Sequence, residues 1–502
     1  MAKNKNVEIS LEEKLKKALI PVDEQPYAIP SNWVWTRLGE ISKLSGGSGF
    51  PEKYQGFLDK NIPFYKVGSL KNIDDNFYIE NSENYIDDDI LTEIKAKLFP
   101  ANTIIFAKIG EAIRLNRRAI LKENSCIDNN LMALVSNSSC YFRYVYFWLK
   151  KEDLYKYAQA TTVPSIRQST LEELKFPLPP LNEQKRIVEK LDFLFEKTKR
   201  AKEIIEEIKI DIENRKISIL DRTFKGTLTS KWRNENKTSD VKELLKSINE
   251  EKIKKWEEDC LQAEKDGNKK PKKPTITEVK DMIVPVDEQP YKLPDSWVWV
   301  RLGDLEEIKM GQSPKGEDIL ENGMYGFIGG PADMGDDFPK IKRFTDNPTR
   351  LSDYEELIIS VRATIGKTNI SDNKYCLGRG VCAVSTKNFK SNFLRNYIFS
   401  ITNYLYSIST GTTFSQISKE DIIKILIPLP PLEEQQEIVR VLDEVLENEN
   451  KVKELLELEE RIDILEKSIL HKAFKGELGT QNSSDESAME LLKNSIAINT
   501  KI

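Results

Sequence analysis

Histidine is almost absent from this sequence. The chain has 502 residues and a single histidine, His471. Catalysis by Ser-His-Asp or Cys-His groups is therefore disfavoured, and a metal site built from several histidines is excluded. An enzyme of this composition would have to move protons with carboxylates and lysines.

Cysteines and long apolar runs are also scarce. The five cysteines form no Cys-x-x-Cys pair, so neither a disulfide framework nor a zinc ribbon is indicated. No run approaches the roughly 18 apolar residues of a membrane span, and the lysine- and glutamate-rich residues 1–19 contain no apolar signal core. These absences predict a cytoplasmic protein with reduced thiols and no membrane partner.

Motifs of nucleotide chemistry are missing as well. The chain has no Walker A sequence and no Asn-Pro-Pro-aromatic tetrapeptide, so neither ATP hydrolysis nor methyl transfer to an amino group is expected of it. The glycine-rich residues 45–49 lack a strand-loop-helix context, and only Gly47 has a counterpart in the second half, Gly311. We interpret them as a turn and predict no cofactor or metal bound by this chain.

The charges of the chain are nearly balanced. It has 76 Lys and Arg against 81 Asp and Glu, for a net charge of −5. Such a chain is not a polycation, so binding to nucleic acid would need local basic patches or the charge of a partner.

The sequence contains two copies of one unit. Residues 21–41 and 285–305 are identical at 14 of 21 positions, and residues 177–196 and 428–447 at 12 of 20. Each copy then reaches Phe-Lys-Gly, at residues 224–226 and 474–476. The inserts between these motifs, residues 40–176 and 304–427, share little sequence, and the first is 13 residues longer. A common frame with different contents predicts one scaffold that presents two recognition surfaces; the alternative is a duplicated domain that simply drifted.

A long helix is predicted after each Pro-Leu-Pro-Pro-Leu motif, with Asn182 as the N-cap of the first. Apolar or small residues recur there with the spacing of a coiled-coil seam. The seam positions are Ile187, Leu191, Leu194, Thr198, Ala201, Ile205, Ile208, Ile212 and Ile219 in the first copy, and Ile438, Leu442, Val445, Val452, Leu455, Leu458, Ile462, Leu465 and Ile469 in the second. Each helix has about 40 residues and a length of about 60 Å. We expect the two to pair antiparallel and bury their seams.

Basic and amide side chains cluster in both inserts. Arg and Lys neutralise phosphates or bind guanine edges, whereas Asn and Gln pair with adenine edges. The predicted DNA-binding residues are Lys108, Arg114, Arg117, Arg118, Asn129, Asn130, Thr161, Thr162, Arg167 and Gln168 in the first copy, and Gln312, Lys342, Arg343, Arg362, Thr364, Lys367, Arg379, Thr412, Thr413 and Gln416 in the second. For any single residue, a solvated surface position is the competing explanation.

The paired motifs resemble the specificity (S) subunits of type I restriction-modification systems. The resemblance rests on Trp-Val-Trp-x-x-Leu-Gly at residues 33–39 and 297–303, on the two Pro-Leu-Pro-Pro-Leu-x-Glu-Gln motifs, and on the Phe-Lys-Gly ends. It implies two target-recognition domains that each read one half of a split site in double-stranded DNA. It also implies assembly with two methyltransferase subunits, to which two restriction subunits can be added. S-adenosylmethionine and ATP with Mg are then expected on those partners.

The predicted fold class is α+β, with two α/β target-recognition domains joined by two long antiparallel coiled-coil helices in a pseudo-two-fold repeat. The expected segments are an N-terminal helical segment (1–20), recognition domain 1 (21–181), spacer helix 1 (182–226), a charged connector (227–284), recognition domain 2 (285–432), spacer helix 2 (433–476) and a C-terminal tail (477–502). The lysine-rich connector has no assigned role.

Two other classes of function compete with DNA recognition. A self-sufficient enzyme is disfavoured by the single histidine and the absent motifs. A coiled-coil scaffold for protein-protein contacts is disfavoured because a scaffold has no need for two diverged basic inserts. The dissimilarity of the inserts further predicts an asymmetric DNA target.

Overall fold

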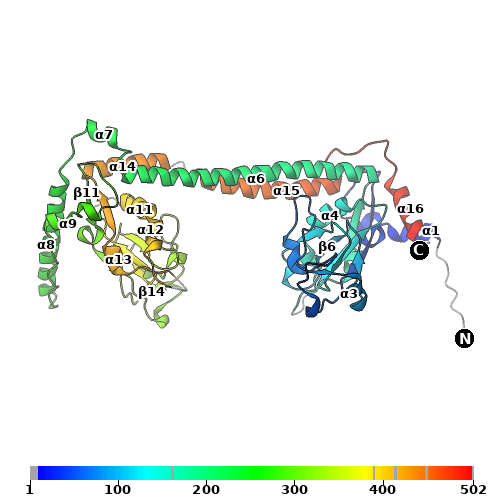
Figure 1. The fold of residues 1–502 in the computed structure, drawn as a ribbon, viewed down its shortest axis with the longest axis horizontal. Coiled ribbons are helices and arrows are strands. Elements are labelled where there is room, and N and C mark those ends of the chain that lie inside the picture. Colours follow the sequence, from blue (N-terminus) through cyan, green and yellow to red (C-terminus); the bar gives the residue numbers. More distant parts are fainter. Residues whose placement is uncertain (1–9, 160–162, 388–390, 412–414, 447–449, 500–502) are drawn as a thin grey trace. The chain divides into compact units, whose positions relative to one another are not determined.

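The structure, a computed structural model, describes residues 10–159, 163–387, 391–411, 415–446 and 450–499. The chain divides into two compact units (Figure 1). Unit 1 comprises Met1–Ile205 and Leu456–Ile502, and unit 2 comprises Glu206–Leu455. Unit 1 therefore combines segments from the beginning and the end of the sequence.

Unit 1 is a mixed α/β domain with three small sheets. Its elements are α1 (Leu11–Ala18), β1 (Val34–Arg37), α2 (Leu38–Ile41), β2 (Ser42–Gly46), β3 (Ile62–Tyr65), β4 (Tyr85–Ile86), α3 (Asp88–Glu93), β5 (Leu98–Phe99), β6 (Ile104–Ala107), β7 (Arg118–Ile120), β8 (Ser125–Ile127), β9 (Leu131–Ser136), α4 (Phe142–Lys151), α5 (Gln168–Glu172), β10 (Lys175–Leu178) and α16 (Ala488–Asn499). The strand orders are β1-β10, β2-β9-β6-β7 and β4-β3-β8-β5.

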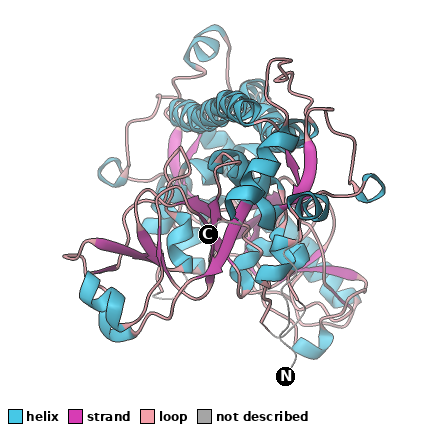
Figure 2. Cartoon of the chain, turned by 90° about the vertical axis from the view of Figure 1, so that its right-hand side faces the viewer, coloured by secondary structure: helices cyan, strands magenta, loops and turns pink. Residues whose placement is uncertain are grey.

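Unit 2 repeats this arrangement. Its elements are α7 (Ser230–Glu235), α8 (Val241–Lys265), α9 (Val279–Met282), β11 (Val298–Arg301), α10 (Leu302–Leu305), β12 (Ile308–Met310), β13 (Tyr325–Ile328), β14 (Phe344–Thr345), β15 (Leu357–Ser360), β16 (Thr368–Ile370), β17 (Tyr375–Leu377), β18 (Val381–Val384), α11 (Ser391–Ser400), α12 (Thr402–Ser407), α13 (Lys419–Ile423), β19 (Leu426–Leu429) and α14 (Leu432–Leu446). The orders β11-β19, β12-β18-β15-β16 and β14-β13-β17 match those of unit 1, apart from β5. Helices, strands and long loops alternate in both units (Figure 2).

Two long helices, α6 (Leu181–Phe224) and α15 (Asn450–Lys475), each contribute residues to both units. In unit 1 they run antiparallel: Thr198 Oγ1 donates to Glu466 Oε1 at 2.6 Å, and one turn further along α6 Lys202 pairs with Asp463 at 2.7 Å. The predicted α+β fold with an antiparallel helix pair is confirmed. Asn182 is not the N-cap, because α6 begins at Leu181 and the Gln184 N–H donates to the Pro180 carbonyl.

The predicted helix seam is only partly buried. Ile187 and Leu191 are fully buried, but Ile208, Leu458 and Leu465 are 39–50 % exposed. The side chain of Val452 lies outside the described residues. The 3-4 spacing therefore predicted helical structure correctly over α6, α14 (Leu432–Leu446) and α15, while residues 447–449 of the second predicted helix lie outside the described residues. It overestimated how much of the seam is covered within the chain.

The duplicated motifs form the frame of each unit. The indole N–H of Trp33 donates to Glu183 at 2.9 Å, and that of Trp297 donates to Glu434 at 2.8 Å. All four side chains are buried, so each indole bond satisfies two polar groups that have no access to water. The Trp-Val-Trp and Pro-Leu-Pro-Pro-Leu-x-Glu-Gln motifs recur because each is the partner of the other.

The Phe-Lys-Gly ends also have a structural cause. Gly226 and Gly476 follow the long helices with φ of 72° and 74°, the left-handed conformation in which glycine is favoured. A Cβ at these positions would overlap with Pro294 and Pro30, respectively. The preceding Phe224 and Phe474 are buried in the cores of units 2 and 1.

The charged connector is part of unit 2. Leu245 and Ile248 of α8 are buried in its core, as Leu492 and Ile496 of α16 are in the core of unit 1. Residues 243–246 and 490–493 have the same sequence, Glu-Leu-Leu-Lys, and they lie in two helices with the same packing role.

Candidate nucleic-acid interface

One edge of the four-stranded sheet in unit 2 gathers four polar side chains that the sequence had singled out. We call Gln312, Arg379, Arg362 and Gln416 the edge row of unit 2. Gln312 follows β12, Arg379 precedes β18, Arg362 follows β15 and Gln416 precedes α13. All four are exposed. The antiparallel pairing of β12 and β15 with β18 brings these three strand ends together.

Backbone contacts fix the order of this row. The Arg379 N–H donates to Ser313 Oγ at 3.2 Å, which places residues 312–313 beside it. The Val361 N–H donates to the Gly380 carbonyl at 2.9 Å and continues the β15–β18 ladder, so Arg362 lies across from Arg379. Arg362 in turn forms a β-bridge with Gln416.

The same backbone contacts recur in unit 1 with different side chains. The Lys108 N–H donates to the Asn130 carbonyl at 2.9 Å, and Ile109 forms a β-bridge with Ser165. Ser48 N–H donates to the Ile127 carbonyl at 2.9 Å, as Gln312 N–H does to Leu377 in unit 2 at 2.8 Å. The edge row of unit 1 is therefore Ser48, Asn129, Ile109 and Ser165. It differs from the row of unit 2 at every position.

A glycine holds each row in place. A Cβ at Gly47 would overlap with the carbonyl oxygens of Ile127 and Asp128, and one at Gly311 with that of Gly378. Glycine, the only residue that the two loops share, is thus required at positions 47 and 311 because another backbone segment lies too close for a side chain. Residues 45–49 are the end of β2 followed by a β-bridge from Ser48 to Asp128, so our interpretation of them as a simple turn was incomplete.

Unit 1 adds lysines beside its row. Lys97 Nζ donates to Ser45 Oγ at 2.9 Å and to the Gly46 carbonyl at 3.2 Å. The Lys108 ammonium lies against Gly46. Burial and then the neighbouring Lys97 charge lower the pKa of Lys108. Two ammonium groups that repel each other at a surface edge suit an anionic ligand such as a phosphate.

Four predicted contacts are engaged elsewhere. Arg118 is only 4 % exposed and donates to the Asn116 and Glu152 carbonyls at 2.7 and 2.6 Å, so its prediction as a DNA contact is wrong. Burial lowers its pKa to about 10. Lys367 Nζ donates to the Met334 carbonyl at 2.6 Å and supports that loop. Arg114 and Arg343 are half-exposed but form ion pairs with Glu111 and Asp333, each at 2.8 Å.

The remaining predicted residues are placed as follows. Arg117, Lys342, Thr364, Arg167 and Gln168 are exposed, with Gln168 bonded to Glu172 at 2.8 Å. Asn130 is half-buried, and its backbone N–H donates to Asp128 at 3.0 Å. Thr161, Thr162, Thr412 and Thr413 lie outside the described residues.

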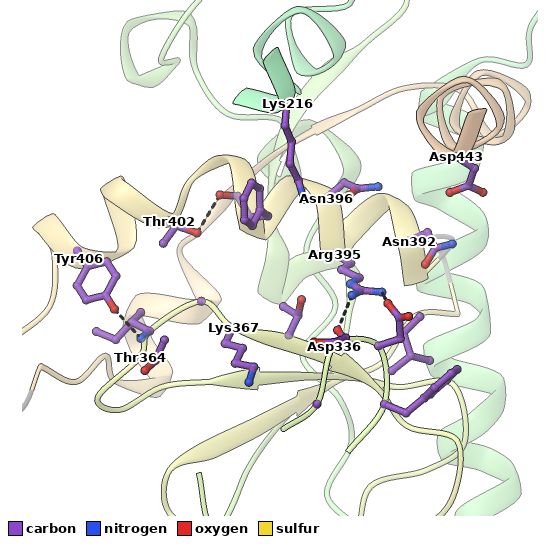
Figure 3. A pocket seen from close by; sticks show the side chains of 18 of the residues that line it. Lys216, Asp336, Thr364, Lys367, Asn392, Arg395, Asn396, Thr402, Tyr406 and Asp443 are labelled. Atoms are coloured by element: carbon purple, nitrogen blue, oxygen red, sulfur yellow. Dashed lines mark hydrogen bonds and ion pairs between the residues drawn. The ribbon is translucent and has the colours of Figure 1, made fainter. Parts of the chain in front are cut away.

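A cavity of about 1050 Å³ adjoins the row in unit 2 and is lined by Thr364, Lys367, Arg395, Asn396 and Lys216, among others (Figure 3). Arg395 forms an ion pair with Asp337 at 2.8 Å, so the lining carries charges of both signs.

The corresponding cavity of unit 1 is smaller, about 270 Å³, and its lining includes Phe77 and Tyr146. In each unit one helix contacts the phenylalanine of the Phe-Lys-Gly end through an aromatic side chain. In unit 1, Tyr144 of α4 packs on Phe474. In unit 2, Phe393 of α11 packs on Phe224. Two residues further along α4, Tyr146 stacks on Phe77 at 4.8 Å, where α11 has Arg395.

Among the described residues, no group of three or more His, Cys, Asp or Glu side chains gathers as a metal site. Within the same part of the chain, no helix is both long and apolar enough to cross a bilayer.

The chain matches a known family in both of its copies. Residues 30–210 and 294–460 both match the model of the type I restriction modification DNA specificity domain. The chain belongs to this family. It carries two specificity domains, one for each copy of the sequence repeat, and it is a DNA-recognition subunit of a type I restriction-modification system.

Relatives cover nearly the whole specificity subunit. The chain is 28 % identical over 447 residues to a putative type I restriction enzyme MjaX specificity subunit of Methanocaldococcus jannaschii, which covers 86 % of this chain and 91 % of that protein. The fold is similar to a chain from a structure of type I R-M system assembly, with a TM-score of 0.64 and 22 % identity over 90 % of this chain and all of the other. The HsdS subunit of Thermoanaerobacter tengcongensis matches with a TM-score of 0.50 and 23 % identity over 91 % of this chain and all of the other.

Sequence reasoning missed three members of the row in this specificity subunit. Ser48, Ile109 and Ser165 carry no charge, so a search for basic and amide residues passed over them. A signal for Ser48 was present, because it lies 264 positions before Gln312, the offset of the first repeat. Ile109 and Ser165 are recognised only through the β-bridge that joins them.

Proposed function

We propose that each unit reads one half of an asymmetric, bipartite DNA site through its edge row. The observation that carries this proposal is that equivalent backbone positions hold Asn129 and Ile109 in unit 1 but Arg379 and Arg362 in unit 2. A domain that kept one ligand would need one set of side chains. Two diverged sets on one frame suit two different base sequences.

In this proposal the chain performs no catalysis itself. It acts in the cytoplasm with two methyltransferase subunits, and two restriction subunits can join them. S-adenosylmethionine and ATP with Mg are bound by those partners.

Exposed apolar side chains on the long helices support partner docking. Phe193 and Ile204 of α6 and Ile464 and Leu465 of α15 are 41–65 % exposed in unit 1. In unit 2, Ile210 and Ile217 of α6 are 52 % and 60 % exposed. Apolar residues on a charged helix suit a second protein's helix, and this observation is also the strongest support for a role as a protein-protein scaffold.

A binding experiment separates DNA recognition from a scaffold role. The chain would be purified alone and with its methyltransferase subunits, and its affinity for genomic DNA fragments measured across a salt series. We expect weak binding alone, because the net charge is −5, and tight, salt-dependent binding in the complex. Sequencing of the methylated DNA should then give one asymmetric motif with an unread gap. A palindromic motif, or equal affinity with and without the partners, would contradict the proposal.

A further inference from the structure

The two arginines of the edge row in unit 2 have no counterpart in unit 1. The equivalent positions there are Asn129 and Ile109. A guanidinium is a planar fork of donors that matches O6 and N7 of guanine, whereas an ammonium is a point charge and an amide matches adenine. The difference therefore bears on which bases the two half-sites contain.

The backbone of Arg379 is held closely on both sides. Gly378 N–H donates to the Ile328 carbonyl at 2.8 Å, and Gly380 N–H donates to the Gly329 carbonyl at 3.2 Å. A Cβ at Gly378 would lie 2.9 Å from Gly329 Cα, and one at Gly380 would overlap with the Gly329 carbonyl. Gly378 and Gly380 thus allow this segment to pack closely against residues 329–330. The backbone of Arg379, which lies between them, is held in a fixed position.

The backbone of Arg362 is held by a hydrogen bond, a sharp turn and a β-bridge. It follows β15 directly, and its carbonyl accepts from Ser360 Oγ at 3.1 Å. The next residue, Ala363, has a φ of 61°, so the chain turns sharply after the arginine. The β-bridge with Gln416 holds the other side.

Among the described residues, the guanidinium groups of Arg362 and Arg379 have no ion-pair partner, whereas other arginines of unit 2 do. Arg343 and Arg395 are paired with Asp333 and Asp337, each at 2.8 Å. In the part of the chain that the structure describes, Arg362 and Arg379 form no ion pair, although they lie across from each other on one ladder. Like charges in that arrangement are unfavourable unless an acceptor-rich ligand lies over them.

We infer that Arg379 and Arg362 are specificity-determining residues of unit 2, and that each binds O6 and N7 of a guanine in the half-site that this unit reads. The inference rests on the proposed function. The half-site of unit 1 is read without an arginine at these positions, by the Asn129 amide and by contacts from Lys97 and Lys108 to the DNA backbone.

The test uses the complete complex with its methyltransferase subunits and sequencing of the methylated motif. Exchange of residues 304–427 first identifies the half-site of unit 2. The variants Arg379→Lys and Arg362→Lys keep the positive charge but lose the fork. We expect each to relax discrimination at one G·C pair of that half-site by roughly 5- to 150-fold, the effect of one bidentate contact, and to leave the other half-site unchanged. Asn129→Ala should relax only the half-site of unit 1.

Lys387→Ala is the matched control. Lys387 is exposed in unit 2 but follows the opposite end of β18, so its loss should not change the motif. Thermal melting of each variant shows whether the fold is retained, and the two arginine variants test the inference independently.

The experiment distinguishes a failure of the arginine inference from a failure of the proposed function. If the wild-type complex methylates no defined sequence, the proposed function fails. If it reads a bipartite site but the unit 2 half-site has no G·C pair, or neither lysine variant relaxes it, the arginines contact only phosphates. The inference is then wrong, while the proposed function stands.

Discussion

Units 1 and 2 are alike where the sequence repeats and different at the edge rows, through which we propose that they read DNA. The strand order of the four-stranded sheet is the same, and the buried bond from tryptophan to glutamate measures 2.9 Å in one unit and 2.8 Å in the other. The edge rows on this frame share no side chain. The cavity beside α11 in unit 2 is about 1050 Å³, whereas the cavity beside α4 in unit 1, where Tyr146 stacks on Phe77, is about 270 Å³. The repeated frame and the two edge rows therefore use separate sets of residues.

Exchange of a whole insert is the strongest way to test this separation. Replacing residues 40–176 by an unrelated insert of the same family should change one half-site completely and leave the other intact. The reason is that the buried frame bond from Trp33 to Glu183 lies outside the insert. The measurement is sequencing of the methylated DNA from the assembled chimera. A change in both half-sites would show that the units do not read independently.

The frame should be most sensitive where a buried charge is paired. Glu434 has a fully buried side chain that accepts from Trp297, Thr229 and the Arg233 guanidinium. The variant Arg233→Met leaves this carboxylate without its cation and should destabilise unit 2 by about 3 kcal/mol. Hydrogen exchange read peptide by peptide should show faster local opening in unit 2 and none in unit 1.

Arg222→Met serves as the control for that measurement, because Arg222 is exposed on the neighbouring helix end. Equal destabilisation by both variants would mean that the buried pair has no special role in the frame.

Substitution of the glycine that packs beside an edge row should destabilise its unit less than loss of the buried ion pair does. Gly311→Ala places a Cβ against the Gly378 carbonyl and should cost unit 2 about 1–3 kcal/mol, as overpacking does. Gly316→Ala is a matched control in the same loop region, because nothing lies within 4 Å of a Cβ there. We expect only the first variant to lower the melting temperature and weaken methylation. An unaffected Gly311→Ala variant would show that the row can shift without loss.

The smallest effect is expected for the substitution Lys108→Val, which gives unit 1 the residue that unit 2 has at the equivalent position. Lys108 corresponds to Val361, which is buried, through the backbone bonds to Asn130 and Gly380. The pKa of Lys108 is lowered, so its charged form is less favourable in the folded state than in the unfolded chain. At neutral pH the lysine therefore opposes folding, and this penalty fades as the pH rises through its lowered pKa.

Lys108→Val should consequently melt at the same or a higher temperature at pH 7, with the difference shrinking at alkaline pH. It should also bind DNA more weakly in the complex, with the slope of affinity against salt reduced by about one contact. A variant with a lower melting temperature and unchanged binding would assign Lys108 to the frame rather than to the DNA.

Several features could be predicted from the sequence because they depend on local patterns. The motif offsets gave the duplication, and the apolar spacing gave the long helices and their antiparallel pairing. Four members of the unit 2 row were predicted as DNA contacts from their chemistry alone, a role that awaits the experiments above.

The errors have a common cause. Arg118 was predicted as a DNA contact because it is basic and lies in a basic cluster of the insert, but it pairs with Phe106 across two strands and is buried. The seam residues Ile208, Leu458 and Leu465 were predicted to be covered because periodicity counts residues on a face, not atoms above it. Exposure depends on what other segments contribute, and no local pattern contains that information.

The sequence by itself determined the repeat, the frame motifs and the family of this protein, because those depend on residue identity and spacing along the chain. Only the tertiary structure decided which side chains form the two edge rows. Residues 48, 109, 129 and 165 are distant in sequence, and they become neighbours through strand pairing and β-bridges. Backbone hydrogen bonds do not depend on side-chain identity, so the same edge can be built from different residues, and its members are found by geometry rather than by similarity.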